Sequence, residues 1–208
     1  MRAFTYEIIL NTYLIMKDIH YQITFHTYWH CGSGLSAGAD VDALVVKDAD
    51  GLPFVPGKTM KGLLRDAAEL LLQLNPAKYD GCGWLACVGY AAKDGSAYGQ
   101  GSAFFANATL QEQEAETIRL QPGLARYLYS NVTSTAIDET TGTAHEHSLR
   151  KMEVTVPCTL KGCIYDVPDD CVTLLSDSMK VVKRLGVGRN RGLGRCTLAV
   201  STLKERES

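Results

Sequence analysis

The segment from Arg184 to Cys196 is the first place where the residue types suggest chemistry. It reads RLGVGRNRGLGRC, so four glycines and four arginines fall within thirteen residues. Glycine has no side chain to keep another backbone at a distance, and the planar arginine guanidinium donates paired hydrogen bonds to phosphate oxygens. This composition predicts contact with a phosphate-bearing ligand. The alternative is a solvated surface loop.

The spacing of the glycines argues against the common nucleotide-binding loops. A dinucleotide fingerprint needs a third glycine three residues after the second, but Arg191 stands where that glycine would be. A P-loop needs Gly-Lys-Ser/Thr, which is absent from this segment, and the segment follows a predicted helix where both motifs follow a strand. Repeated phosphates along a nucleic-acid strand therefore fit better than a nucleotide cofactor.

Cations cluster around this loop although the whole chain is slightly acidic. The formal net charge is −2 at pH 7, so any attraction to nucleic acid must come from local patches. If all six cations of the patch neutralise phosphates of a single strand, the log–log salt slope should be about −4. The six basic residues, with no acid between them, are Lys180, Lys183, Arg184, Arg189, Arg191 and Arg195.

A second basic feature lies on a predicted helix over residues 58–74. Apolar residues recur there at helical spacing, and Pro56-Gly57 places a loop before the helix. Lys58, Lys61 and Arg65 fall on or near the polar face, which is the usual place for solvated side chains. We expect the start of this helix and the glycine loop to converge on one ribose-phosphate track.

The remaining pattern predicts an α+β fold in a single domain with insertions, with helices on one face of a mainly antiparallel sheet. No internal repeat or long linker divides the chain. The predicted segments are a strand at 18–30, an extended stretch at 41–48, the helix at 58–74, a compact insertion loop at 75–102, a strand at 103–110, a short helix at 123–130, an exposed arm or hairpin at about 134–152, a strand at 154–167, a helix at 169–186 and a strand at 196–203.

The cysteine count and the first residues of the chain indicate the cellular compartment of the protein. Seven cysteines are an odd number and no secretory signal precedes them, so we expect reduced thiols and a cytoplasmic protein. The apolar run from Tyr6 to Met16 is short for a membrane span and contains Glu7. Residues 1–15 are the segment in question. It is either an extension or a leading strand.

Three segments, in this order, resemble the RAMP superfamily. They are GADVDALVVKDADGLPFVPGKTMKGLLR, TAIDETTGTAHEHSLRKMEV and LGVGRNRGLGRC. The first is similar to the superfamily's signature of an acidic residue, Leu-Pro-aromatic-aliphatic-Pro-Gly and a basic helix start. The second resembles the arm of the backbone subunits of type III CRISPR interference complexes, and the third the carboxy-terminal glycine-rich loop. The resemblance covers residues from about 16 to 203.

The resemblance implies an RRM-like (ferredoxin-like) core with a β-hairpin thumb. Such subunits stack along a CRISPR guide RNA, their thumbs wedge into the guide–target duplex, and a loop aspartate cuts the target RNA. The implied partners are guide RNA, target RNA, copies of this chain or related RAMP subunits, and the large and small effector subunits. No membrane partner is implied.

The resemblance also assigns residues. Asp42 stands where the cleaving aspartate falls, and Asp40 is the second choice. The implied thumb residues are Ile137, Asp138, Thr143, His145 and His147. The implied RNA-binding residues are Gly32, Ser33, Lys58, Lys61, Arg65, Arg184, Gly186, Gly188, Arg189, Asn190, Arg191, Gly192, Gly194 and Arg195.

The chemistry expected at Asp42 is modest because RNA can be cut through its own 2′-hydroxyl. A free aspartate has a pKa near 3.9 and is a weak base, so positioning should dominate. The family pattern implies Mg²⁺ or another divalent ion for cleavage. Without the resemblance, both aspartates would read as turn or capping residues.

Zinc is a further possibility, because relatives often carry a zinc knuckle within the region that corresponds to residues 75–102. Only Cys82 and Cys87 are nearby thiols there. Four ligands would require distant residues such as Cys31 or a histidine. Unliganded thiols are the alternative.

Three other interpretations stay open. The chain could be a guide-binding scaffold that does not cleave. It could be a guide-processing endoribonuclease of the same superfamily, which would rely on a histidine such as His26 or His30. It could also be an unrelated α+β domain.

Overall fold

The computed structural model describes six stretches of the chain. Among these residues, no helix is both long enough and apolar enough to cross a membrane. The expectation for residues 1–15 falls almost wholly outside the described residues, since only Ile15 is among them. The stretches are residues 15–36, 41–91, 98–121, 123–138, 140–145 and 148–205.

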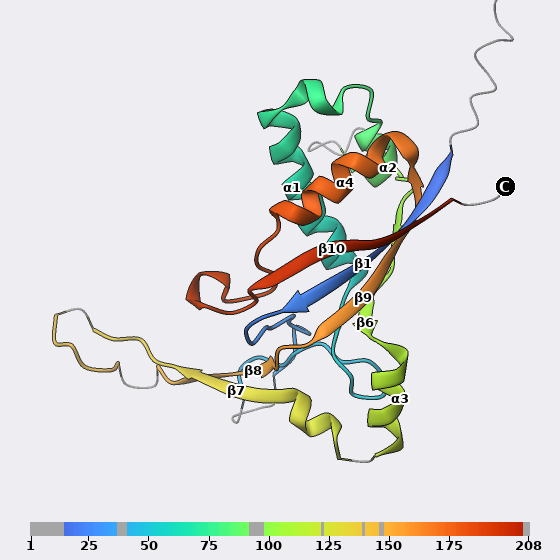
Figure 1. Cartoon of the computed structure of the whole chain (residues 1–208). Helices are drawn as coiled ribbons and strands as arrows, with labels where there is room; N and C mark the ends of the chain where they lie inside the picture. The colour runs from blue at the N-terminus through green and yellow to red at the C-terminus, as the bar shows by residue number, and fades with distance from the viewer. Residues whose placement is uncertain are drawn as a thin grey trace, which may run out of the picture.

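An antiparallel sheet forms the centre of the molecule (Figure 1). Its strands follow the order β10-β1-β9-β6-β2, and β5 pairs with β9 beside that path. The strands are β1 (Met16–Phe25), β2 (Phe54–Val55), β5 (Phe104–Phe105), β6 (Ala108–Leu110), β9 (Thr159–Pro168) and β10 (Cys196–Glu205).

The central strand β1 shows why the sheet is covered on one face only. Ile19, Tyr21, Ile23 and Phe25 are buried, whereas the residues between them are half-buried. Side chains alternate between the two faces of a strand, so the buried set faces the core and the other set faces outward. This alternation was predicted from the sequence and is confirmed.

β1 ends at Phe25, earlier than the predicted strand end at residue 30. Beyond Phe25 the chain leaves the sheet, and Trp29 forms an isolated antiparallel bridge with Thr155. The Phe25 and Trp29 rings stack with centroids 4.3 Å apart, which holds the departing segment beside the sheet. The segment therefore joins a different structure, the hairpin described below.

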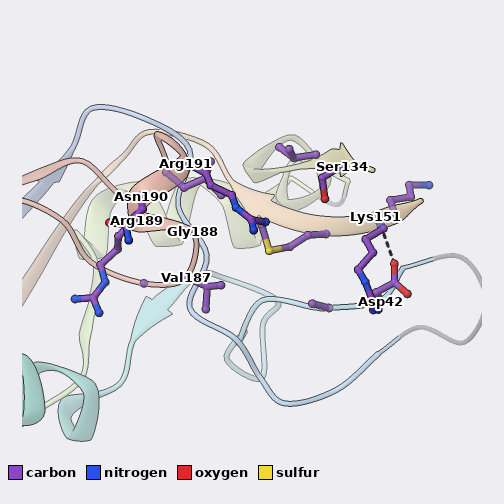
Figure 2. Close-up of a pocket in the computed structure, with 14 residues that line it drawn as sticks. Asp42, Ser134, Lys151, Val187, Gly188, Arg189, Asn190 and Arg191 are labelled. Atoms are coloured by element: carbon purple, nitrogen blue, oxygen red, sulfur yellow. Dashed lines mark hydrogen bonds between the residues drawn. The ribbon is translucent and has the colours of Figure 1, made fainter. Parts of the chain in front are cut away.

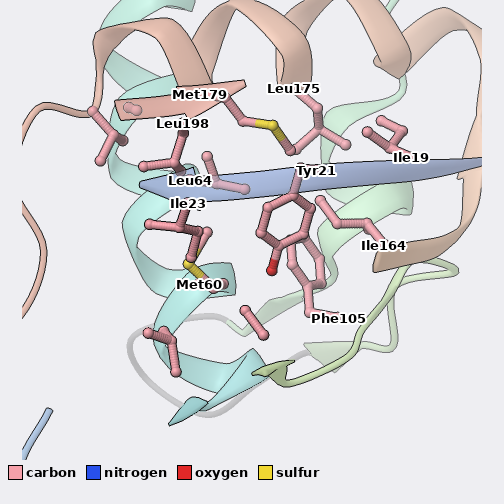
Figure 3. Close-up of a cluster of buried hydrophobic side chains, with 14 of the residues drawn as sticks. Ile19, Tyr21, Ile23, Met60, Leu64, Phe105, Ile164, Leu175, Met179 and Leu198 are labelled. Carbon is pink, nitrogen blue, oxygen red and sulfur yellow. The ribbon is translucent and has the colours of Figure 1, made fainter. Parts of the chain in front are cut away.

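Two helices, α1 (Gly57–Leu74) and α4 (Asp169–Val181), pack against each other over the buried face of the sheet (Figure 1). Figure 3 shows Met60 and Leu64 of α1 and Leu175 and Met179 of α4 meeting the buried side chains of β1. Both helices were predicted from apolar residues at helical spacing, although α4 ends at residue 181 and the prediction ran to 186.

The order of these elements is β1-α1-β6-β9-α4-β10, and the four core strands lie as β10-β1-β9-β6. This is the split βαβ arrangement of the ferredoxin-like, RRM-like fold. The predicted fold class, an α+β antiparallel sheet with helices on one face, is confirmed.

Two predicted strands are each interrupted. The strand expected at 103–110 is divided between β5 and β6, because the Asn107 side chain there accepts a hydrogen bond from the backbone N–H of Gly57 (2.9 Å) and holds the start of α1. The strand expected at 154–167 is divided near Pro157, which has no N–H to donate to a ladder.

Helical structure was missed in two places. α3 (Glu112–Leu120) was not predicted, because Ala115 is its only fully buried residue and the apolar stripe is too weak to see. The insertion at 75–102 was read as a loop, yet it holds a helical turn (Pro76–Tyr79), the short helix α2 (Trp84–Val88) and the small hairpin of β3 (Tyr90–Ala91) and β4 (Tyr98–Gly99). A helical turn at Ala125–Leu128 matches the short helix predicted at 123–130.

The predicted arm is a separate hairpin that projects away from the sheet (Figure 1). It is built from β7 (Tyr129–Ser134) and β8 (Arg150–Thr155), which pair from Tyr129↔Thr155 to Ser134↔Arg150. The hairpin therefore begins five residues before the start of the predicted arm.

Truncating a core residue of α1 should destabilise the fold much more than truncating an exposed one. Leu64 is fully buried and Leu74 is 71% exposed on the same helix. Leu64→Ala is expected to lower the free energy of unfolding by about 2–5 kcal/mol, because it leaves a cavity. Leu74→Ala should stay within about 0.5 kcal/mol of the parent. Urea unfolding followed by circular dichroism measures both; equal losses would contradict this assignment of the core.

Candidate nucleic-acid interface

A hollow of the described structure lies between the β7–β8 hairpin, the loop that carries Asp42 and the glycine loop (Figure 2). Its volume is about 930 Å³. Its charged lining residues are the cations Arg150, Lys151, Arg189 and Arg191 and the single carboxylate Asp42. A concave surface with this excess of positive charge attracts a polyanion.

Asp42 is held at the edge of β8 by two hydrogen bonds to one residue. Its backbone N–H donates to the carbonyl oxygen of Lys151 (2.8 Å), and its Oδ2 accepts the backbone N–H of Lys151 (2.7 Å), the dashed line in Figure 2. The other carboxylate oxygen, Oδ1, accepts no hydrogen bond from the described residues. Asp42 is exposed, so this oxygen is free to act on a ligand in the hollow.

Glu153 of β8 holds the rest of the Asp42 loop in place. Its backbone N–H donates to the carbonyl oxygen of Ala43 (3.0 Å). Its carboxylate accepts the backbone N–H of Val45 (3.1 Å) and forms an ion pair with Lys47 (2.8 Å). Sequence reasoning missed Glu153; the one available signal was an isolated acid two residues after the basic pair Arg150–Lys151.

The glycine loop docks on the segment that follows β1. The backbone N–H of Val187 donates to the carbonyl oxygen of His30 (2.9 Å), and that of Gly194 donates to the carbonyl oxygen of Tyr28 (2.7 Å). Gly186 has φ +94°, and a Cβ there would overlap the carbonyl oxygen of His30. Glycine at 186 is thus required by the chain's own packing, whereas the sequence argument had assigned the glycines to approach by a ligand.

The six clustered cations do not share one surface. Arg189 and Arg191 line the large hollow. A separate hollow of about 500 Å³ is lined by Lys183, Arg184 and Arg195 together with His26, Cys196 and Thr197. The sixth, Lys180, forms an ion pair with Asp177 (2.9 Å). The six cations are close in sequence but not in space, so one nucleic-acid strand in the large hollow can contact fewer of them than the sequence suggests.

A third hollow, of about 310 Å³, lies where α1 meets the glycine loop. On the helix side it is lined by Thr59, Leu63 and Asp66, and on the loop side by residues that include Arg189. The two elements therefore lie beside one another, while their expected convergence on one ribose-phosphate track stays a prediction. The three helix cations are not among the lining residues, and Arg65 forms an ion pair with Glu69 (3.0 Å).

The other predicted RNA-binding residues divide between these places. Ser33 donates its hydroxyl to the carbonyl oxygen of Leu44 (3.0 Å), which pairs the segments on either side of the Asp42 loop. Gly32 lines the third hollow, and Gly188 and Asn190 line the hollow beside Asp42. Gly192 follows the helical turn Arg189–Arg191.

The tip of the hairpin arm is organised by Asp138. Its carboxylate accepts the backbone N–H groups of Thr141 (2.8 Å) and Thr140 (2.9 Å), and these hydrogen bonds lower the pKa of Asp138. Its backbone N–H donates to Thr143 (2.8 Å), beside an isolated bridge from Ile137 to Ala144. Nε2 of His145 lies 3.9 Å from Oδ2 of Asp138. His147 and Asp40 lie outside the described residues.

The two cysteines considered for zinc meet a third that the sequence argument did not name. Sγ of Cys82 lies 2.9 Å from Sγ of Cys171 at the start of α4, and Cys87 forms a hydrogen bond with Cys171. Burial raises the pKa of the Cys82 thiol, and the Cys87 hydrogen bond raises that of Cys171, so both favour the neutral thiol. The described residues contain no group of three His, Cys, Asp or Glu side chains placed to hold a metal ion.

A model of the RAMP superfamily matches residues 22–197. The chain belongs to the RAMP superfamily. No curated protein matches this RAMP chain.

Two solved structures show the same fold. A chain of the type III-B Cmr-beta complex bound to cognate target RNA superposes with TM-score 0.66 at 12% identity, covering 89% of this chain and 98% of that one. A chain of the apo Cmr-beta complex gives TM-score 0.64 at 13% identity, with coverages of 89% and 97%. At these identities the likeness establishes the fold of the RAMP chain.

The packing at Gly186 predicts a difference between two glycine substitutions in the same loop. Gly186→Ala and Gly192→Ala both place alanine at positive φ, +94° and +86°, at a cost of roughly 1–2 kcal/mol each. A Cβ at 192 meets nothing within 4 Å, whereas at 186 it overlaps His30. Gly186→Ala should therefore lower the melting temperature further. Equal melting temperatures would show that the loop does not dock on His30.

Proposed function

We propose that this RAMP chain is a guide-RNA-binding filament subunit of a type III CRISPR effector complex, and that it cleaves complementary target RNA with Asp42. The observation that carries the proposal is the hollow beside Asp42: a carboxylate with one open oxygen, Oδ1, lines a space that is also lined by four cations. Family membership and the fold shared with chains of the Cmr-beta complexes support the same function.

The cations account for binding. Arg150 and Lys151 come from the hairpin, and Arg189 and Arg191 from the glycine loop, so positive charge reaches the hollow from two sides. Each cation that neutralises a phosphate releases a counterion, which gives an affinity that is independent of sequence and sensitive to salt. A subunit that carries guides of any sequence requires this kind of binding.

The proposed cleavage uses the RNA's own nucleophile. The ribose 2′-oxygen attacks the adjacent phosphorus while the bond from phosphorus to the 5′-oxygen breaks. The products are a 2′,3′-cyclic phosphate and a 5′-hydroxyl, and solvent water supplies the proton to the leaving 5′-oxygen. In the proposed step, Oδ1 of Asp42 takes the 2′ proton, and a positioned base contributes about 10²–10⁴-fold. The four cations stabilise the charge that develops on the phosphoryl oxygens.

We retain Mg²⁺ as a proposed cofactor. Magnesium in phosphoryl-transfer sites is held by one or two carboxylates, waters and substrate phosphates. As an alternative to taking the 2′ proton itself, the open Oδ1 of Asp42 would serve as one such ligand. When bound, the ion would supply Lewis-acid polarisation of the phosphoryl oxygen. No zinc is proposed at Cys82 and Cys87.

The proposed partners follow from the filament. They are guide RNA, target RNA, neighbouring copies of this chain or related RAMP subunits, and the large and small effector subunits, assembled in the cytoplasm. The hairpin that projects from the sheet is the proposed thumb, which enters the guide–target duplex (Figure 1).

A non-catalytic scaffold is the second candidate function. It is favoured by the Oδ2 hydrogen bond of Asp42 to Lys151, which gives this carboxylate a structural role. Guide processing has weaker support: His26 and His30 line different hollows and do not form a pair.

Asp42→Asn separates catalysis from structure. The amide oxygen of asparagine can still accept the Lys151 N–H, but the variant has no carboxylate to take a proton. In the assembled complex, target cleavage should fall by about 10²-fold or more, while guide retention stays at the parental level. Gel assays of cleaved target and of co-purified guide measure the two. Unchanged cleavage would exclude Asp42 from catalysis and would favour the non-catalytic scaffold function for this chain.

Chelation tests the cofactor in the same assembled complex. EDTA is expected to stop target cleavage while the guide stays bound, because the cations of the hollow hold RNA without the ion. Cleavage that continues at the same rate in EDTA would remove Mg²⁺ from the proposal.

The salt dependence of binding tests the hollow as the RNA site. With four cations meeting phosphates, the log–log slope for single-stranded RNA should be about −3. Arg191→Gln should make the slope shallower by about 0.7. Lys180→Gln is the matched control because Lys180 already pairs with Asp177, and its slope should equal the parent's. Fluorescence anisotropy across a salt series measures the slopes; a larger change at Lys180 would place RNA elsewhere.

A further inference from the structure

The hollow between α1 and the glycine loop contains a buried histidine whose ring is only half engaged. His30 is 2% exposed and lines this hollow of about 310 Å³. Its Nδ1 lies 2.6 Å from the carbonyl oxygen of Glu153. A carbonyl oxygen can only accept, so Nδ1 carries the hydrogen and donates it. In the neutral ring, Nε2 is therefore an acceptor.

Nε2 lies next to Gly32, a residue that also lines the hollow. Nε2 accepts no hydrogen bond from the described residues. It is also not completely enclosed, because it is absent from the set of fully buried, unpartnered side-chain atoms of those residues, which are Tyr21 Oη, Trp84 Nε1 and Thr155 Oγ1. A Cβ at Gly32 would stand 3.1 Å from Nε2. The absence of a side chain at 32 leaves the ring edge accessible. A buried acceptor aimed at a hollow calls for a donor from a ligand.

We propose that this hollow binds one ribose of an RNA strand and that Nε2 of His30 accepts a hydrogen bond from its 2′-hydroxyl. The inference rests on the proposed RNA binding and adds the group that distinguishes RNA from DNA. The 2′-hydroxyl is the difference between the two at any one nucleotide backbone position.

The rest of the lining suits a sugar. Asp66 adds a second acceptor and Thr59 a hydroxyl, both of which pair with sugar hydroxyls, while a carboxylate would repel a phosphate. No Phe, Tyr or Trp is among the lining residues, and the His30 ring is only 2% exposed, so the hollow offers no open aromatic face on which a base would stack.

The position of the hollow between α1 and the glycine loop agrees with an RNA strand that lies over the glycine loop. Gly186, Val187 and Arg189 line both this hollow and the larger cationic one. A strand whose phosphates meet the cations of the larger hollow therefore has a sugar within reach of the smaller one. Arg189 is available to the phosphate between them.

Two substitutions test the assignment on the purified full chain. His30→Asn places an amide N–H near the Nδ1 position, so the hydrogen bond to Glu153 can persist while the Nε2 acceptor is lost. Gly32→Ala keeps His30 and puts a methyl group beside Nε2; Gly32 is not at positive φ, so the backbone tolerates it. His26→Asn, at an exposed histidine in a different hollow, is the matched control.

The measurement is the anisotropy of a fluorescein-labelled single-stranded RNA and of the DNA of the same sequence. The parent should prefer the RNA. His30→Asn and Gly32→Ala should each weaken RNA binding by about three- to tenfold, the effect of one hydrogen bond, and leave DNA binding unchanged. His26→Asn should match the parent on both probes.

The outcomes separate this inference from the proposed function. A parent that binds no RNA would contradict the proposed function itself. A parent that prefers RNA, with both variants showing the same preference or losing RNA and DNA equally, would overturn the ribose assignment alone. If His30→Asn melts below the assay temperature, Gly32→Ala decides the question.

Discussion

The backbone of β8 is the common reference to which the parts of the candidate site are fixed. At Lys151 it pairs with Asp42, at Glu153 it meets the Asp42 loop, and at Thr155 it pairs with Trp29. The carbonyl oxygen of Glu153 also accepts a hydrogen bond from Nδ1 of His30. The carbonyl oxygen of His30 in turn accepts the backbone N–H of Val187 and so anchors the glycine loop. Displacing β8 would therefore move the aspartate, the glycine loop and the hairpin together.

This arrangement explains how an acidic chain can present a basic surface. The net charge of −2 describes the whole chain, but binding depends on which charges face the ligand. On the hollow that holds Asp42, four cations face one carboxylate, while Lys180 is neutralised by Asp177 outside it. Some of the chain's acidic residues lie away from this hollow, for example Glu112 and Glu114 in the first turn of α3. Composition alone could not reveal this division.

The core was predictable because its signals are local. The alternation in β1 and the apolar stripes of α1 and α4 repeat within a few residues, so each can be read without knowing its neighbours. α3 escaped notice because Ala115 is its only fully buried residue. The division of two predicted strands depended on Asn107 and Pro157, and the first of these acts through a contact with Gly57, fifty residues away.

The candidate site was predictable only in part, for a related reason. Asp42 and Arg191 were identified from motifs, and they do line one hollow. Glu153 and Cys171 carry no motif; their roles arise from contacts across about a hundred residues of sequence. His30 was noticed only as an available base, because nothing local says that its Nδ1 would be committed to a carbonyl oxygen. The tertiary contacts decide which atoms remain free.

Asp42 and His30 share a further property that links stability to function. Each has two polar side-chain atoms, one used to hold β8 and one without a partner in the described structure: Oδ2 and Oδ1 in Asp42, Nδ1 and Nε2 in His30. The hydrogen bond made by the first atom limits side-chain rotation, so the second points in a fixed direction without a cost on binding. Alanine at either position would remove both effects at once. Asparagine at either position preserves the inner hydrogen bond, and so distinguishes a residue that builds the site from one that acts in it.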